Sequence, residues 1–424
     1  MQIVLCMLIV SILTSCYLFP IGLYFLPESW NTKMILAVTG AVLAFIEYAR
    51  NRLAVVSKYL FGAIVGSFLF SLCCYMSVTL NNTEDYTYVT YFISFFTWLG
   101  GAYAICCFIR WIHGKSNLSL LTGYLAFVCV VQCILAIFID RVVSFRLLVD
   151  DFVVQGEDFL HKVDRLYGVG ASLDSAGVRF SIVLMLIAWT MCREMNERKS
   201  YKEWILLSVA FLIITIVGNM IARTTLVGSS LGIIYILLKT FSTGFILQER
   251  YIRMWGVILI LLGIGTAVSV NLYETDATFQ NQIRFGFEGF FNWVEEGEWR
   301  TDSTDKLNRL MWIWPNETNV WIWGTGKFDN WFFGTDIGYC RFILYCGLIG
   351  FCVFVMFFVY NAWVVKQRFA GCGLLAFFLL LITFIVWLKV STDIFFIYAL
   401  LFCLDEEPIV EEYNENSLLY SRNL

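Results

Sequence analysis

Charged residues are scarce in this sequence. Only 15% of the 424 residues are Asp, Glu, Lys or Arg, whereas 59% are hydrophobic and the mean hydropathy is +0.74. A soluble chain of this size would expose much of that apolar surface to water, so the composition excludes an ordinary soluble protein. Apolar runs of about twenty residues recur from end to end and are long enough to cross a bilayer as helices. We therefore predict an all-α integral membrane protein.

Other classes are excluded by features that the sequence lacks. The apolar runs do not alternate with polar residues, which excludes a transmembrane β-barrel. The fourteen cysteines lie in apolar runs and none falls in the polar segments 140–178 and 272–338, so no disulfide framework is expected. Their spacing matches no zinc pattern, and we expect no metal, no cofactor and no nucleic-acid partner.

The apolar runs predict about twelve transmembrane helices in one polytopic domain, residues 1–405, followed by a polar tail, residues 406–424. The predicted spans are residues 3–26, 33–49, 58–80, 88–109, 118–139, 176–192, 203–221, 224–242, 254–272, 339–361, 373–389 and 392–405.

Lys and Arg are missing from the short loops 27–32 and 81–87, whereas the loops that alternate with these are basic. Cytoplasmic loops of membrane proteins carry an excess of Lys and Arg, so we predict that both termini are cytoplasmic. The long segments of about 140–178 and 272–338 then lie outside the cytoplasm. The basic loops hold Arg50, Arg52, Lys58, Arg110, Lys115, Arg193, Arg198, Lys199, Lys202, Arg250, Arg253, Lys366 and Arg368.

One charge, Arg223, interrupts the long apolar run 205–238, within the stretch G-N-M-I-A-R-T-T-L-V-G-S-S (218–230). A straight helix of that length would extend about 51 Å, well beyond a hydrocarbon core of about 30 Å. Basic loops flank the run on both sides, so it must cross the membrane an even number of times. We predict a helical hairpin with Arg223 at its extracytoplasmic tip.

The two long outer segments carry several arginines, among them Arg165, Arg284 and Arg309. Structureless loops of this length are uncommon unless they are functional, and residues 281–294 are predicted to form an interfacial helix. Arginines that converge from two loops and a hairpin tip suggest an anionic ligand, because the guanidinium fork suits phosphate. The alternative is that each arginine reaches lipid headgroups or pairs with a loop acid.

His161 is the single histidine of the predicted outer face, and His113 lies in a cytoplasmic loop. An imidazole with a pKa near neutral suits general base catalysis. The alternative is a solvated loop histidine without a chemical role.

Short motifs follow one another along the second half of the chain. They are I-A-R-T-T-L (221–226), S-T-D-K-L-N-R-L-M-W (303–312), W-G-T-G-K-F-D-N (323–330) and D-I-G-Y-C-R-F-I-L-Y-C-G-L-I-G (336–350), with R-L-Y-G (165–168) ahead of them. In this order the chain resembles the O-antigen polymerase and O-antigen ligase superfamily. Ligases have His-Asn where this chain has Asp336-Ile337, a departure that favours the polymerase branch.

The resemblance implies an inverting, metal-independent glycosyltransferase of the GT-C type in the bacterial inner membrane. It would act on undecaprenyl-pyrophosphate-linked repeat units at the periplasmic face, and a chain-length regulator protein is a further expected partner. Arg223 and Arg309 would neutralise the leaving pyrophosphate, and Asp336 or His161 would serve the acceptor hydroxyl, with Asp164 and Glu317 as other candidates. The expected substrate-binding residues are Arg165, Arg284, Tyr167, Gly326, Lys327 and Tyr339.

Several alternatives stay open. A ligase would transfer the glycan to lipid A-core, a flippase would move it across the membrane, and another GT-C enzyme would use a metal bound by its first outer loop. Asp336 has a second interpretation as the N-cap of the helix that follows. The aromatic residues of 312–333 belong either to a membrane interface or to a sugar-stacking surface.

Overall fold

The computed structural model describes residues 2–27, 30–51, 59–156, 160, 165–196, 201–241 and 249–405. In this part of the chain eight helices are long and apolar enough to cross a membrane. Each of them coincides with a predicted span, and together they define an all-α, multi-pass membrane protein. The eight helices are α2 (Thr32–Asn51), α3 (Leu60–Leu80), α4 (Tyr91–His113), α5 (Leu118–Arg141), α8 (Leu173–Asn196), α9 (Tyr201–Ile221), α11 (Glu249–Thr275) and α16 (Gly338–Arg368).

Four shorter apolar helices coincide with the other four predicted spans: α1 (Gln2–Leu18), α10 (Thr225–Phe241), α17 (Gly373–Val386) and α18 (Phe395–Cys403). At about 1.5 Å per residue, a helix needs about 20 residues to cross the hydrocarbon core. The shortest of the four, α18, has 9 residues. The number of membrane crossings therefore stays a prediction.

The boundary predicted for the first span is wrong, because α1 ends at Leu18 rather than near residue 26. Pro20 follows two residues later, and a proline disfavours helical backbone in the residue before it. The chain then enters the short strand β1 (Gly22–Leu23), which pairs antiparallel with β2 (Val153–Val154) of the first long polar segment. This segment also contains α6 (Val143–Phe152) and is therefore not structureless.

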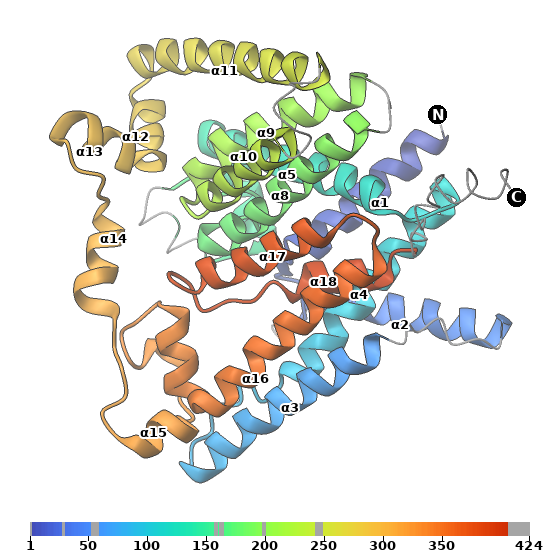
Figure 1. The fold of residues 1–424 in the computed structure, drawn as a ribbon, viewed down its shortest axis with the longest axis vertical. Coiled ribbons are helices and arrows are strands. Elements are labelled where there is room, and N and C mark those ends of the chain that lie inside the picture. The colour runs from blue at the N-terminus through green and yellow to red at the C-terminus, as the bar shows by residue number, and fades with distance from the viewer. Residues whose placement is uncertain are drawn as a thin grey trace, which may run out of the picture.

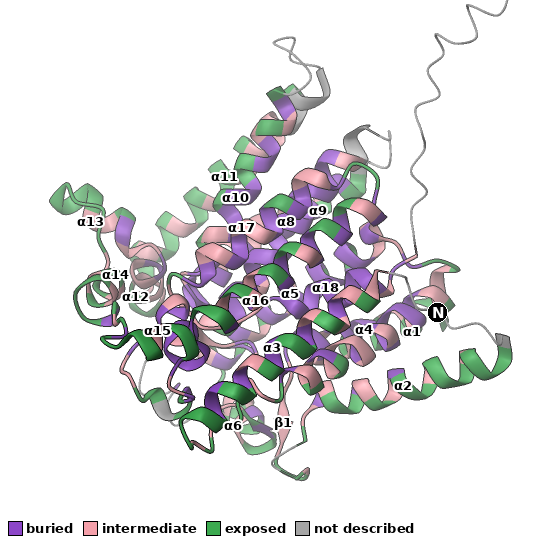
Figure 2. Cartoon of the chain, turned by 60° about the horizontal axis from the view of Figure 1, so that its bottom comes forward, coloured by how far each residue is buried: buried purple, intermediate pink, exposed green. Residues whose placement is uncertain are grey.

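Helix α8 forms the centre of the bundle, since 89% of its apolar window is buried, compared with 0% for α11. Figure 2 shows the same contrast between the purple α8 and the largely green α11. Gly228 of α10 permits a close approach to α8, because a Cβ at this position would lie 2.1 Å from the Cα of Ser181. The Ser181 hydroxyl donates to the Thr224 carbonyl oxygen at 2.8 Å and fixes the hairpin on the core.

The second long segment folds into short helices rather than one interfacial helix. They are α12 (Ala277–Gly286), α13 (Glu288–Glu296), α14 (Asp302–Lys306), a π-helical turn η1 (Leu307–Met311), α15 (Thr318–Trp323) and a 3-10 turn η2 (Asp329–Trp331). The single helix predicted for 281–294 is wrong, because the chain breaks at Phe287. The Asn219 side chain donates to the Gly286 carbonyl oxygen at 2.6 Å and draws it away from the helical ladder.

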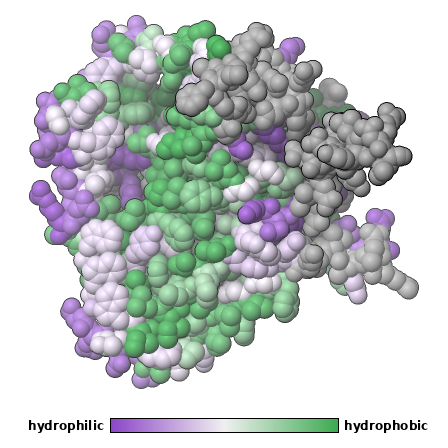
Figure 3. All heavy atoms as spheres, viewed as in Figure 1, coloured by the Kyte–Doolittle hydropathy of each residue, from purple (hydrophilic) through white to green (hydrophobic). Residues whose placement is uncertain are grey.

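The helices α12–α15 lie together along one side of the molecule, at the left of Figure 1, and the N-terminus lies on the opposite side. We call the side with α12–α15 and the α9–α10 connection the loop face. In Figure 3 a hydrophobic band runs through the molecule from top to bottom, and hydrophilic residues border it at the loop face. A hydrophobic band with a polar border is the pattern expected for a protein that lies in a bilayer.

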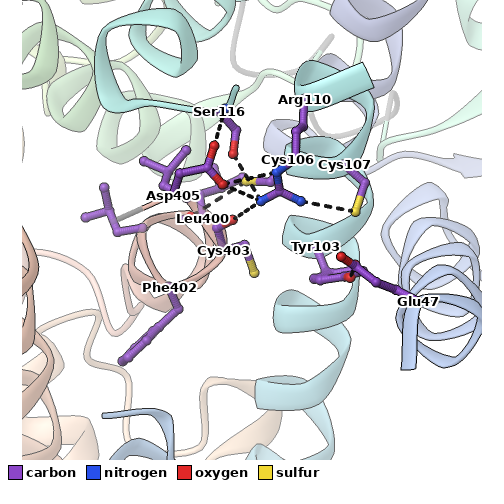
Figure 4. A network of polar contacts seen from close by, with 12 residues as sticks. Glu47, Tyr103, Cys106, Cys107, Arg110, Ser116, Leu400, Phe402, Cys403 and Asp405 are labelled. Atoms are coloured by element: carbon purple, nitrogen blue, oxygen red, sulfur yellow. Dashed lines mark hydrogen bonds and ion pairs between the residues drawn. The ribbon is translucent and has the colours of Figure 1, made fainter. Parts of the chain in front are cut away.

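The face opposite the loop face is held by a polar network around Arg110 (Figure 4). The Arg110 guanidinium donates to the Asp405 carboxylate through Nε at 3.0 Å and Nη2 at 2.7 Å. The second Asp405 oxygen accepts from the Ser116 amide at 2.7 Å. The end of α18 is thereby joined to the connection between α4 and α5.

Candidate functional site

Arg223 lies at the tip of a helical hairpin, as predicted. Helix α9 ends at Ile221, α10 begins at Thr225, and the tip lies on the loop face. The Arg223 side chain is 15% exposed and forms an ion pair with Glu288 of α13, whose side chain is 18% exposed. The guanidinium also lies 4.4 Å from the centre of the Phe285 ring. The hairpin tip and the second long segment therefore meet at Arg223.

Arg165, from the first long segment, reaches the same aromatic ring. Its guanidinium carbon lies 4.6 Å from the centre of Phe285, and it makes no hydrogen bond or ion pair with any residue that the structure describes. Burial lowers the pKa of Arg165; the charge of Arg223 adds to this effect, and that of Asp174 opposes it. An arginine remains protonated despite such a shift, so a half-buried cation with free donors remains beside Arg223.

A third cation, Lys389, was not predicted. It lies between α17 and α18 and donates to Asp174, in the first turn of α8, at 2.8 Å. The same carboxylate oxygen accepts from the Thr224 hydroxyl of the hairpin tip at 2.6 Å. Lys389 and Asp174 each lie at the loop-face end of a predicted span, and this shared position was the sequence signal for them.

These five charged residues form what we call the outer cluster: Arg165, Asp174, Arg223, Glu288 and Lys389. Three cations against two carboxylates leave one positive charge. A cation that is removed from water needs a compensating partner, and arginine suits the oxygens of phosphate. The arrangement can therefore hold an anion beside the ion pair of Arg223 and Glu288.

Three further predicted residues lie at the loop face, but their hydrogen-bond partners are not residues of the outer cluster. Arg284 of α12 donates to both carboxylate oxygens of Glu295 at 2.8 Å and to the Tyr273 hydroxyl at 2.9 Å. The Tyr167 hydroxyl donates to Asp150 at 3.3 Å. The Tyr339 hydroxyl donates to the Phe384 carbonyl oxygen at 2.9 Å. None of these hydrogen bonds joins the outer cluster.

The glycine motifs of 323–326 and 347–350 lie in contact with each other in the structure. Helix α16 is kinked at Gly347, where φ is 66° and ψ is -179°. The kink frees the carbonyl oxygens of Leu344 and Tyr345, and these accept from the amides of Thr325 at 2.7 Å and Gly326 at 3.0 Å. The G-T-G turn therefore docks onto the kink, which gives Gly326 a packing role in the fold.

Gly324 leaves room for the same contact, because a Cβ there would lie 2.2 Å from the Tyr345 carbonyl oxygen. The structural role of both glycine motifs is thus a close approach of two backbones.

Asp85, in the connection between α3 and α4, holds the rest of this turn. Its Oδ2 accepts from the amides of Phe328 and of Asp329, the latter at 2.6 Å. Partial burial acts to raise the pKa of Asp85, but hydrogen bonds from Asp329, Thr87 and Phe328 outweigh it and the pKa is lowered. This residue was not predicted from the sequence, because its partners lie far along the chain.

The lowered pKa predicts a pH dependence of this docking. Since the folded pKa of Asp85 lies below its unfolded value of about 3.9, the stabilisation is present above that value and is lost as the pH falls through the folded pKa. We expect hydrogen exchange at Phe328 and Asp329, corrected for its intrinsic pH dependence, to accelerate below about pH 4. Asp85→Asn should show the same acceleration at neutral pH, and the exposed neighbour variant Glu84→Gln should not. Equal protection at pH 3 and pH 7 would contradict this role.

Arg309, Lys327 and Asp336 lie in the second half of the long segment and do not join the outer cluster. Arg309 is exposed on η1 and contacts no described partner through a hydrogen bond or ion pair. The Lys327 ammonium lies 4.3 Å from the centre of Phe332. Asp336 accepts from the Trp331 indole at 3.0 Å. The N-cap of α16 is Ile337, so the capping interpretation of Asp336 is wrong.

The aromatic residues of this region partly stack on one another. Trp314 lies between Trp312 and Trp321, with ring centres 5.7 Å apart in both pairs. Trp312 and Trp314 are each 40% exposed, and Glu317 nearby is exposed. Both interpretations of the aromatic cluster, membrane interface and sugar stacking, remain compatible with this exposure.

His161 and Asp164 lie outside the described residues. No family model, curated protein or solved structure matches the chain.

Proposed function

We propose that the chain is a glycosyltransferase of the bacterial inner membrane that polymerises lipid-linked oligosaccharide repeat units. The repeat units are carried on undecaprenyl pyrophosphate, and the loop face is periplasmic, with both termini in the cytoplasm. The proposed class is GT-C, with inversion at the anomeric carbon, and a chain-length regulator is a proposed partner. The motif order of 165–350 supports this proposal as a resemblance.

The observation that carries the proposal is the meeting of three distant segments at Phe285. Arg165 of the first long segment and Arg223 of the hairpin tip lie 4.6 Å and 4.4 Å from one ring of the second long segment. Lys389 adds a third cation through Asp174 and Thr224. A pyrophosphate of a lipid in the adjacent leaflet would find charge compensation from groups that the fold has already oriented.

The reaction places clear demands on such a site. The acceptor hydroxyl oxygen forms the new bond to the anomeric carbon, and the bond from that carbon to the pyrophosphate oxygen breaks. The electron pair of the broken bond stays on the pyrophosphate, where Arg165, Arg223 and Lys389 would stabilise the developing charge. The acceptor hydroxyl loses its proton to a carboxylate. Glu288 and Asp174 are the carboxylates of the outer cluster that stand beside these cations.

Reconstitution into liposomes tests the proposal. We expect the purified protein, given an undecaprenyl-pyrophosphate-linked oligosaccharide, to produce a ladder of longer glycans and to release undecaprenyl pyrophosphate. A product that appears only when lipid A-core is added would instead indicate a ligase. Movement of the substrate to the other leaflet without any new glycosidic bond would indicate a transporter, and either result would overturn the polymerase assignment.

A further inference from the structure

A second pair of cations, separate from the outer cluster, lies at the loop-face ends of two apolar helices. Lys33 is in the first turn of α2, and Arg179 is in α8 less than two turns after its start. Asp393, just before α18, is the acid whose charge acts on both. None of the three residues belongs to the motifs or to the predicted site, and their charges sum to one positive charge.

Aromatic rings lie beside both cations, and two of these rings, Trp98 and Phe396, have centres 5.7 Å apart. The Lys33 ammonium lies 4.4 Å from the centre of Trp98. The Arg179 guanidinium carbon lies 5.5 Å from the centre of Phe396 and 6.0 Å from that of Phe19. Ring faces attract cations, but they leave the N–H donors unsatisfied.

The hydrogen-bonding capacity of Arg179 is largely unused. A guanidinium carries five N–H donors, and among the described residues Arg179 makes a single hydrogen bond, to the Ser175 carbonyl oxygen at 2.8 Å. Its Nε is buried without a partner. Asp393 accepts from the Phe395 amide at 2.8 Å instead of pairing with either cation. Unsatisfied donors together with a net positive charge, partly shielded from water, are features of a site that can hold an anion.

The position restricts the kind of anion. Lys33 and Arg179 keep part of their surface accessible, and only 17% of the apolar window of α2 is buried, so Lys33 can be approached from the lipid phase. A fork of donors next to an ammonium suits the tetrahedral oxygens of phosphate. The apolar rings of Trp98, Phe396 and Phe19 beside the cations can pack against the start of a lipid hydrocarbon chain.

We propose that Lys33 and Arg179 form a binding site for the phosphate of a membrane lipid, with Asp393 as the charge that limits its affinity. The site is distinct from the outer cluster and does not depend on the polymerase assignment. Its ligand is a lipid phosphate, either the diester of a phospholipid or the monoester of a polyprenyl carrier.

Binding to the full-length protein in detergent tests this site by native mass spectrometry. The probes are phosphatidylglycerol, undecaprenyl phosphate and diacylglycerol, which lacks the phosphate. We expect the two phosphate lipids to bind and diacylglycerol not to bind. The phosphate lipid that binds more tightly identifies the preferred headgroup. Tighter binding of either phosphatidylglycerol or undecaprenyl phosphate supports the site.

Variants then locate the binding. Arg179→Gln and Lys33→Gln should each weaken the binding of the phosphate lipids at least tenfold. If Arg179→Gln does not fold, Lys33→Gln alone tests the site. Asp393→Asn keeps an oxygen for the Phe395 amide and removes the opposing charge, so it should tighten binding at least threefold. Arg300→Gln is the matched control, since Arg300 is exposed and pairs with Glu296. Unchanged binding in Lys33→Gln and Asp393→Asn would overturn the proposal.

Discussion

Arg223→Ala is expected to abolish the glycan ladder in the reconstituted reaction, with the rate of chain extension falling by at least about a hundredfold. The variant removes the hairpin-tip cation that stabilises charge on the leaving pyrophosphate. Arg223→Lys should recover little activity, because an ammonium keeps the charge but loses the planar fork of donors. Chain extension is measured as product length on gels and as released undecaprenyl pyrophosphate.

Two comparisons separate this effect from a loss of folding. Arg300→Ala removes an exposed arginine of the same long segment and should leave the ladder intact. Glu288→Gln removes the carboxylate that pairs with Arg223, so inorganic pyrophosphate should bind more tightly to this variant than to the wild type. Normal ladders from folded Arg223→Ala would remove Arg223 from the reaction.

Gly347→Ala is expected to lower the free energy of unfolding by at least about 2 kcal/mol. The φ of 66° at Gly347 is unfavourable for any residue with a Cβ. An added Cβ would also lie 2.1 Å from the Ile322 carbonyl oxygen, so the G-T-G turn would have to leave the kink. Thermal unfolding in detergent measures the effect, together with the amount of monodisperse protein.

Gly123→Ala in α5 is the matched control, because no atom lies within 4 Å of a Cβ built there. Alanine is favoured over glycine in a helix interior by up to about 1 kcal/mol, so this variant should be neutral or slightly stabilised. Equal melting temperatures for Gly347→Ala and the wild type would show that the kink tolerates a side chain.

The helices were predicted well from the sequence where they depend on a local property, the apolar character of a continuous run of residues. A continuous apolar run is required of any helix in lipid, and the runs 58–80 and 118–139 correspond to α3 (Leu60–Leu80) and α5 (Leu118–Arg141). The hairpin with Arg223 at its tip followed from length and charge alone. The end of α1 was missed because Pro20 breaks the helix inside an apolar run.

The candidate site was predictable only in part. Ion pairs between residues far apart in the sequence produce no periodic pattern from which they can be predicted. A shared membrane face for Arg165 and Arg223 followed from the topology, and the structure brings both to Phe285. Lys389 and Asp174 are 215 positions apart, so their ion pair could not be read from spacing. Arg309 and Asp336 were chosen from motifs, and neither forms a hydrogen bond or ion pair with the outer cluster among the described residues.

The second long segment is anchored very differently at its two ends. Its C-terminal part is fixed through the Gly347 kink to the core, whereas its N-terminal part follows α11, whose apolar window has no buried residue. Helix α11 approaches α9 closely at Gly265, where an added Cβ would lie 3.3 Å from Leu212. Helices α12 and α13 are held against the bundle at the hairpin tip, by the hydrogen bond from Asn219 to the Gly286 carbonyl oxygen and by the ion pair of Arg223 with Glu288. Arg223 thus belongs both to the outer cluster and to the attachment of this segment to the bundle.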